Sequence, residues 1–239
     1  MKAKSFSWST TDVRSLLPPH WVRNVSRAAG RARPGVLYPT SVTSREGSRE
    51  MQIATLSLAG AELVACLPWL DLLYRTVLRE LAQVVSGDRP VLPAVGAGQY
   101  HGVILNVLRG NSMRYEAHVD SNPITGLLFL STHLRGAGGE FVVARDSASS
   151  SVDDIEADCD VIYPVVGQFL IFDGRRWPHY VRSLSSPTGL RISAAMNYYT
   201  EECPESMRPA DLDGHLFGED VLPRAVAEPV TVGHAGHYM

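Results

Sequence analysis

A chain of 239 residues is long enough for one sizeable β-rich domain. Its hydrophobic content of 45% and charged content of 20% are typical of a globular protein, and a formal net charge of −3 gives no general attraction to nucleic acid or to anionic membranes. The most apolar stretch, residues 53–73, is interrupted by Glu62, Pro68 and Asp71, which argues against a membrane span. We therefore expect neither a nucleic-acid nor a membrane partner.

The cysteine pattern predicts a reducing environment. Cys66, Cys159 and Cys203 are far apart in the sequence, form no C-x-x-C pair and leave an odd count. The first eight residues carry basic side chains but no apolar run follows them, so they do not resemble a secretory signal. We expect a cytoplasmic protein.

The first hundred residues predict mainly helices. The basic character of residues 1–50 could mark a patch for an acidic ligand, but a solvated helix face is the commoner explanation. A proline start and a stop at Gly30 predict a short helix over residues 20–30. After Pro68, apolar residues recur at three- and four-residue steps as far as Val85, which predicts one long helix that packs on a sheet and ends at Gly87.

Beyond residue 100 the pattern changes to short β-type runs separated by turn residues. Eight strands are predicted, at residues 100–109, 113–120, 126–134, 140–145, 160–164, 168–173, 179–184 and 190–200. Eight short strands suit a double-sheet jelly roll. The polar, acidic segment 146–158 predicts a mobile loop, either a lid or a plain surface loop. The tail with His234 and His237 predicts a flexible end rather than a second metal site.

These elements predict one domain in three parts. Residues 1–99 supply helical and β elements that pack on the core, residues 100–200 form the β core, and residues 201–239 form a C-terminal extension.

Two histidines and an aspartate have the types and positions of a metal site. Residues i and i+2 of a strand point to the same side, so His118 and Asp120 share a face, and His179 follows about sixty residues later. Two imidazoles and one carboxylate can hold one face of a divalent iron and leave the other face open. The H-x-D pair alone is a weak signal, but the ordered strands and His179 favour a metal site.

The order of the motifs resembles that of the iron(II)- and 2-oxoglutarate-dependent dioxygenases, nearest in pattern to the prolyl-4-hydroxylase-like branch. The matching positions, over roughly the middle two-fifths of the chain, are His118 and Asp120, Gly138-Gly139-Glu140, Gly167 before an apolar strand, His179 and Arg191. The resemblance implies a mainly β fold with flanking helices and a double-stranded β-helix core, the cupin-like jelly roll. It also implies iron(II) held by His118, Asp120 and His179, with 2-oxoglutarate as cosubstrate and O₂ as oxidant.

The resemblance assigns the far carboxylate of 2-oxoglutarate to Arg191 and Ser193, which share a strand face. The family often adds a tyrosine from its first or second strand, and the aligned position here is near Arg109. Three alternatives stay open: Arg109 replaces that tyrosine, Tyr115 supplies the hydroxyl, or the residue belongs to substrate binding.

The substrate is less well defined by the sequence. Arg175 and Arg176 directly precede His179 and would suit an anionic small molecule, such as an amino acid or a natural-product intermediate. Asn106 and Asn197 interrupt apolar strands, so each is either a substrate contact or a satisfied core amide.

The presence of Asp120 favours a hydroxylase, or a desaturase, over the related halogenases, which lack this carboxylate. We therefore expect a 2-oxoglutarate-dependent hydroxylase of a small molecule. A protein side-chain hydroxylase and a non-catalytic jelly-roll protein that binds metal or 2-oxoglutarate remain alternatives.

Overall fold

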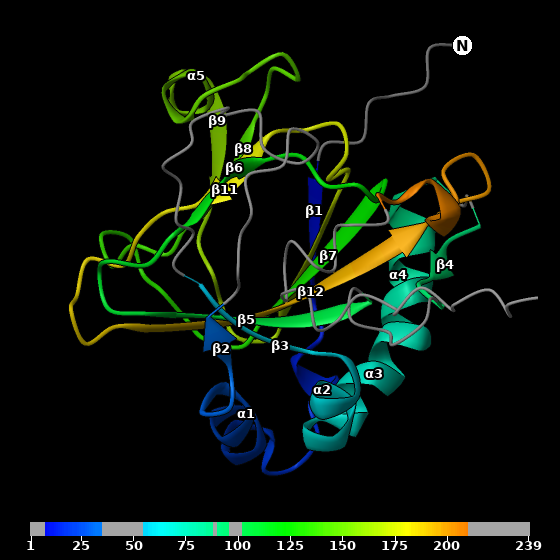
Figure 1. Cartoon of the computed structure of the whole chain (residues 1–239), viewed down its shortest axis with the longest axis vertical. Coiled ribbons are helices and arrows are strands. Elements are labelled where there is room, and N and C mark those ends of the chain that lie inside the picture. The colour runs from blue at the N-terminus through cyan, green and yellow to red at the C-terminus, as the bar shows by residue number, and fades with distance from the viewer. Residues whose placement is uncertain (1–7, 35–54, 88–89, 96–101, 210–239) are drawn as a thin grey trace, which may run out of the picture.

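The computed structural model describes residues 8–34, 55–87, 90–95 and 102–209, apart from the side chain of Glu116. Two antiparallel sheets face each other in this part of the chain (Figure 1). The larger sheet contains β1 (Trp8–Asp12), β2 (Arg33–Pro34), β3 (Leu56–Ala59), β4 (Leu92–Pro93), β5 (Val103–Arg109), β7 (Ile124–Phe129), β10 (Gln168–Phe172) and β12 (Leu190–Tyr199). The smaller sheet contains β6 (Tyr115–His118), β8 (Phe141–Ala144), β9 (Cys159–Ile162) and β11 (His179–Val181).

The strand order is that of a double-stranded β-helix. The larger sheet contains the run β10-β7-β12-β5 and the smaller sheet has the order β6-β11-β8-β9, all paired antiparallel. Consecutive strands therefore alternate between the sheets for most of the core. Each of the eight predicted strands overlaps one of these elements. The predicted fold class, a mainly β jelly roll with flanking helices, is confirmed.

Segments before residue 100 extend the larger sheet at both edges. Strand β1 pairs with β10 at one edge, and β3 pairs with β5 toward the other. The N-terminal part of the chain thus contributes strands to the core sheet as well as helices that cover it.

The helices lie mostly on one face of the larger sheet (Figure 1). They are α1 (Trp21–Ala29), α2 (Gly60–Cys66), α3 (Pro68–Arg75), α4 (Val77–Val85) and α5 (Val152–Ala157), with two short 3-10 helices at Arg14–Leu16 and Glu205–Met207. The main core forms where α1–α4 cover the larger sheet, and Tyr74 and Leu78 are fully buried there. Among the helices of the described residues, none combines the length and the apolar character that a membrane span requires.

The prediction of one long helix after Pro68 is wrong in one respect, because the helix is broken at Thr76. The backbone of Thr76 leaves the helical region with φ −117° and ψ −104°. Its hydroxyl donates to the carbonyl oxygen of Leu72 at 2.7 Å, a bond that competes with regular helix geometry. Two helices, α3 and α4, result, and each keeps its apolar residues on the sheet.

The acidic segment 146–158 also differs from the prediction of a loop. It contains α5, which begins with a capping box in which Ser151 and Asp154 bond each other's backbone. Ile155 of this helix is buried against Val142 and Ala144 on the outer face of the smaller sheet. Because that face points away from the larger sheet, the segment is not a lid over the space between the sheets. The predicted flexible tail with its two histidines lies outside the described residues.

Candidate metal centre

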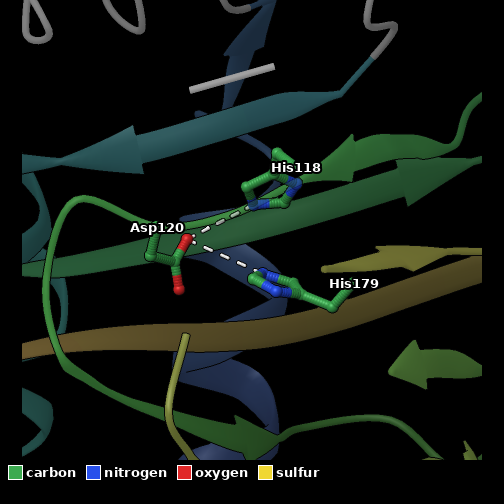
Figure 2. Close-up of side chains that lie close together, drawn as sticks. All are labelled: His118, Asp120 and His179. Carbon is green, nitrogen blue, oxygen red and sulfur yellow. Dashed lines mark ion pairs between the residues drawn. The ribbon is translucent and has the colours of Figure 1, made fainter. Parts of the chain in front are cut away.

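His118, Asp120 and His179 converge between the two sheets (Figure 2). His118 ends β6 and His179 begins β11, and the two residues are direct partners in the antiparallel pairing. Their Nε2 atoms lie 3.3 and 3.6 Å from Oδ1 of Asp120. One ligand atom from each residue lies within 4.8 Å of the others, so a single ion could contact all three.

The imidazole of His179 is held in the form that binds metals. Its Nδ1 donates to the carbonyl oxygen of Trp177 at 2.9 Å, and since a carbonyl only accepts, the lone pair is left on Nε2, toward Asp120. The rings of Phe141 and Phe172 pack around it, with centroids 5.3 and 4.8 Å away. Burial and the neighbouring His118 lower the pKa of His179, which favours the neutral ligand form.

Asp120 is in the ionised form. Burial raises the pKa of its carboxyl, but the two histidines outweigh burial and hold the pKa well below its usual range. Two imidazole nitrogens and one carboxylate oxygen form the donor set that suits a non-haem iron(II) with open positions. No cysteine belongs to this group, so it lacks the soft ligands common in structural zinc sites.

Arg191 and Ser193 lie on the face of β12 that points toward the smaller sheet. Arg191 is only 2% exposed, and its Nε donates to the carbonyl oxygen of Gly139 at 2.8 Å. Its Nη1 donates to Oγ of Ser193 at 2.9 Å, whereas Nη2 has no partner among the described residues. Burial lowers the pKa of Arg191 to about 10, and no carboxylate in the described part of the chain counters this effect. A buried guanidinium with an unused N–H fits the carboxylate of a bound anion.

The glycine pair 138–139 allows the backbone to approach Arg191. Both glycines have positive φ values, 75° and 78°. A Cβ on Gly139 would lie 2.9 Å from Cδ2 of Leu184 and 3.1 Å from Cδ of Arg191. The absence of a side chain therefore lets the Gly139 carbonyl accept from the guanidinium.

Arg109 does not belong to the site, contrary to the first of the three alternatives for that position. In β5 the neighbouring Leu108 packs between the sheets, so Arg109 points to the opposite face. It is exposed, and its Nη2 donates to the carbonyl oxygen of Ala29, the last residue of α1. Tyr115, by contrast, lies beside the metal ligands, with its ring centroid 4.9 Å from that of His118. Burial and the nearby charge of Asp120 raise the pKa of Tyr115.

Asn106 and Asn197 both lie on the inner face of the larger sheet and are half-buried. Asn106 is paired with Ser193, and Asn197 is paired with Thr125. Neither residue belongs to the core under the helices. They border the space that also contains the metal ligands and Arg191.

Arg175 and Arg176 lie in an exposed loop next to Asp120. The loop is placed by Gly174, whose carbonyl oxygen accepts the Asp120 N–H at 2.8 Å. Nη1 of Arg175 donates to Sγ of Cys203, and the guanidinium of Arg176 lies 4.7 Å from the Trp177 ring centre. These arginines are at the edge of the site rather than inside it.

Two residues at the site were not expected from the sequence. They are Thr125, whose hydroxyl donates to Oδ2 of Asp120, and Gly174, which lies against the same carboxylate. One signal for Thr125 was available, because it is a polar residue in an otherwise apolar strand five positions after Asp120. Nothing in the sequence pattern marks Gly174.

No protein-family model matches the sequence, and no curated protein does. Solved structures do match. A 2OG-Fe(II) oxygenase family oxidoreductase from Burkholderia pseudomallei aligns at 16% identity over 81% of this chain and 85% of its own, with a TM-score of 0.53. AviO1 from Streptomyces viridochromogenes Tue57 aligns at 17% identity over 84% and 92% of the two chains, with a TM-score of 0.55.

A third structure, the non-haem α-ketoglutarate-dependent epimerase SnoN from nogalamycin biosynthesis, aligns at 14% identity over 81% of this chain and 78% of its own, with a TM-score of 0.55. At these identities the likeness is one of fold. The resemblance in motif order is thus matched in three dimensions, while the assignment to the prolyl-4-hydroxylase-like branch stays a prediction. The described part of the chain has the fold of the iron(II)- and 2-oxoglutarate-dependent oxygenases.

Proposed function

We propose that this chain is an iron(II)- and 2-oxoglutarate-dependent oxygenase that hydroxylates, or desaturates, a small molecule. The observation that carries the proposal is the pairing of a His118, Asp120 and His179 cluster with a buried Arg191 that has an unused N–H. Iron(II) bound to the cluster would bring O₂ and a bidentate 2-oxoacid together and supply the oxidising chemistry.

The residues of the chain would divide the binding between them. The imidazoles and the carboxylate would hold the metal, with His179 oriented by its bond to the Trp177 carbonyl. Arg191 would bind the far carboxylate of 2-oxoglutarate through Nη2. Because Oγ of Ser193 already accepts from Arg191, the hydroxyl proton of Ser193 is free to donate to the same carboxylate.

We propose an anionic small molecule as the substrate, such as an amino acid or a carboxylated natural-product intermediate. The support comes from the loop beside Asp120. The guanidinium groups of Arg175 and Arg176 have no carboxylate partner among the described residues, whereas those of Arg145 and Arg182 are paired with acidic side chains. Guanidinium groups that lie beside a metal site without a carboxylate partner favour a substrate with negative charge.

The fold does not specify the reaction, since one structure that shares it is described as an epimerase. The test therefore begins with binding and ends with product analysis. Anaerobic titration with iron(II) and 2-oxoglutarate should produce the weak visible charge-transfer band of a bidentate 2-oxoacid complex. Addition of O₂ with candidate anions should then form succinate, and mass spectrometry of the anion would identify hydroxylation, desaturation or epimerisation.

Two arginine variants test whether Arg191 binds 2-oxoglutarate in this titration. Arg191→Ala should bind iron(II) like the parent but need roughly thirty- to several-thousand-fold more 2-oxoglutarate, because truncating one partner of a buried charge pair commonly costs about 2–5 kcal/mol. Arg109→Ala is the matched control, since Arg109 lies on the opposite face of the sheet, and it should titrate like the parent.

Four outcomes would change the proposal. Absence of the band in the parent would overturn it. Equal 2-oxoglutarate affinity in the parent and Arg191→Ala would remove Arg191 from cosubstrate binding. A band without succinate formation for any small anion, but with succinate formation for a peptide, would favour the side-chain hydroxylase, and no turnover with either would favour a binding protein.

A further inference from the structure

Two buried polar residues, Asn122 and Thr125, form a hydrogen-bonded chain to the Asp120 carboxylate oxygen that does not face the histidines. The Thr125 hydroxyl contacts Oδ2 of Asp120, and Nδ2 of Asn122 contacts both the Thr125 hydroxyl and the carbonyl oxygen of Ile124 at 2.8 Å. The other carboxylate oxygen, Oδ1, faces the two histidines. The two oxygens of Asp120 therefore have different partners.

The direction of each hydrogen bond follows from the donors and acceptors involved. The Ile124 carbonyl only accepts, so the nitrogen of the Asn122 amide must face it, and this fixes the orientation of the amide. The second N–H of Asn122 then donates to the Thr125 oxygen. The proton of the Thr125 hydroxyl is left for Oδ2 of Asp120, because a carboxylate only accepts. Asn122 and Thr125 are 3% and 4% exposed, so bulk water does not compete.

Gly174 restricts the same carboxylate from another direction. A Cβ at Gly174 would lie 2.1 Å from Oδ2 of Asp120 and 2.5 Å from the Thr125 hydroxyl oxygen. The Gly174 carbonyl also accepts the Asp120 N–H at 2.8 Å. The loop backbone thus closes over the carboxylate, and any side chain at position 174 would displace Oδ2.

We propose that Thr125, oriented by Asn122, is a positioning residue that holds Oδ2 of Asp120 away from the metal and leaves Oδ1 as the ligand. This inference rests on the proposed function. A carboxylate that bound through both oxygens would occupy a position needed for the 2-oxoacid or O₂, so restricting Asp120 to one oxygen keeps the open side of the site available. Hydrogen bonds to ligating carboxylates commonly tune metal affinity in this way.

Cobalt(II) binding to the full chain under anaerobic conditions tests the proposal, because its visible absorption reports the number and arrangement of ligands independently of turnover. Thr125→Val removes the hydroxyl while keeping the side-chain shape, and it should bind cobalt(II) roughly 10–100-fold more weakly with an altered absorption spectrum. Thr125→Ser restores the donor and should return both affinity and spectrum toward those of the parent.

Thr200→Val is the matched control. Thr200 is also buried, but its hydroxyl oxygen accepts from the Cys203 N–H in the turn after β12 and does not contact Asp120. This variant should bind cobalt(II) like the parent. Gly174→Ala displaces the Asp120 carboxylate by a different means, because its added Cβ would overlap Oδ2. It should weaken cobalt(II) binding even with the Thr125 hydroxyl in place.

The outcomes separate this inference from the proposed function. Failure of the parent itself to bind cobalt(II) would overturn both. Binding by the parent, together with equal affinity and an equal spectrum for a folded Thr125→Val, would overturn the positioning role alone. If Thr125→Val did not fold, parent-like binding by folded Gly174→Ala would overturn it, and weakened binding would support it. Thermal unfolding of each metal-free variant identifies which case applies.

Discussion

The two faces of the larger sheet have different chemistry although the same strands build both. The outer face of β5 and β12 is apolar and packs under α1–α4, with Leu105, Val107, Ile192, Ala194 and Met196 at most 5% exposed. The inner face of these strands has four polar residues, Asn106, Arg191, Ser193 and Asn197, beside apolar ones such as Leu108. Adjacent residues thus serve stability on one side and ligand binding on the other, so the direction of a side chain decides its role.

The largest effect on activity should come from replacing the metal ligands, which lie on the inner side of the larger sheet. Replacement of His118, Asp120 or His179 with Ala removes one of three donors and should abolish substrate-dependent succinate formation. Circular dichroism should still detect the folded sheet, because the core under the helices is unchanged. Full turnover by any of these variants would contradict the site.

On the outer face the expected effect is on stability. Leu105→Ala removes a fully buried side chain from the core under the helices and should lower the free energy of unfolding by about 2–5 kcal/mol. Urea unfolding measures this loss, and the folded variant should bind 2-oxoglutarate with the parent affinity. A loss of cosubstrate affinity at unchanged stability would argue against the separation of the two faces.

The smallest effects on stability and on cosubstrate affinity should come from Asn106, the residue after Leu105 in β5. Asn106→Ala alters a half-buried inner-face residue that pairs with Ser193, so the free energy of unfolding should change by only about 1 kcal/mol or less. Affinity for 2-oxoglutarate should fall by roughly fivefold, the equivalent of one lost hydrogen bond. Large destabilisation with parent-like affinity would instead identify Asn106 as a core amide.

Much of the fold was predictable because its signals are local. Alternating apolar residues and turn residues indicated all eight core strands in order, although the bounds differ by a few residues. The break at Thr76 was not predictable from periodicity, since the apolar pattern continues across it into α4. The capping box at Ser151 was present in the sequence, but the acidic composition around it favoured the prediction of a loop.

The candidate site was predictable where residue type and strand periodicity agree. His118 and Asp120 are two residues apart, as are Arg191 and Ser193, and the structure brings each pair to the inner side. Arg109 instead points to the outer face, toward α1. Both faces of β5 are apolar apart from Asn106, so the pattern of this strand is a weak guide to the direction of Arg109. The contact of Gly174 with Asp120 joins segments far apart in the chain, and no local pattern predicts it.

Strand β1 precedes the other described strands in the chain, but its partner β10 lies near the end of the core. Trp8 donates to Asp160, which lies 152 residues further along the chain, and β1 pairs along its whole length with β10. At translation rates of roughly 5–20 residues per second, that partner emerges about 8–30 s after Trp8. During this interval β1 has no partner strand, so this edge of the larger sheet can close only after β10 has been synthesised. Contacts of such long sequence separation slow folding.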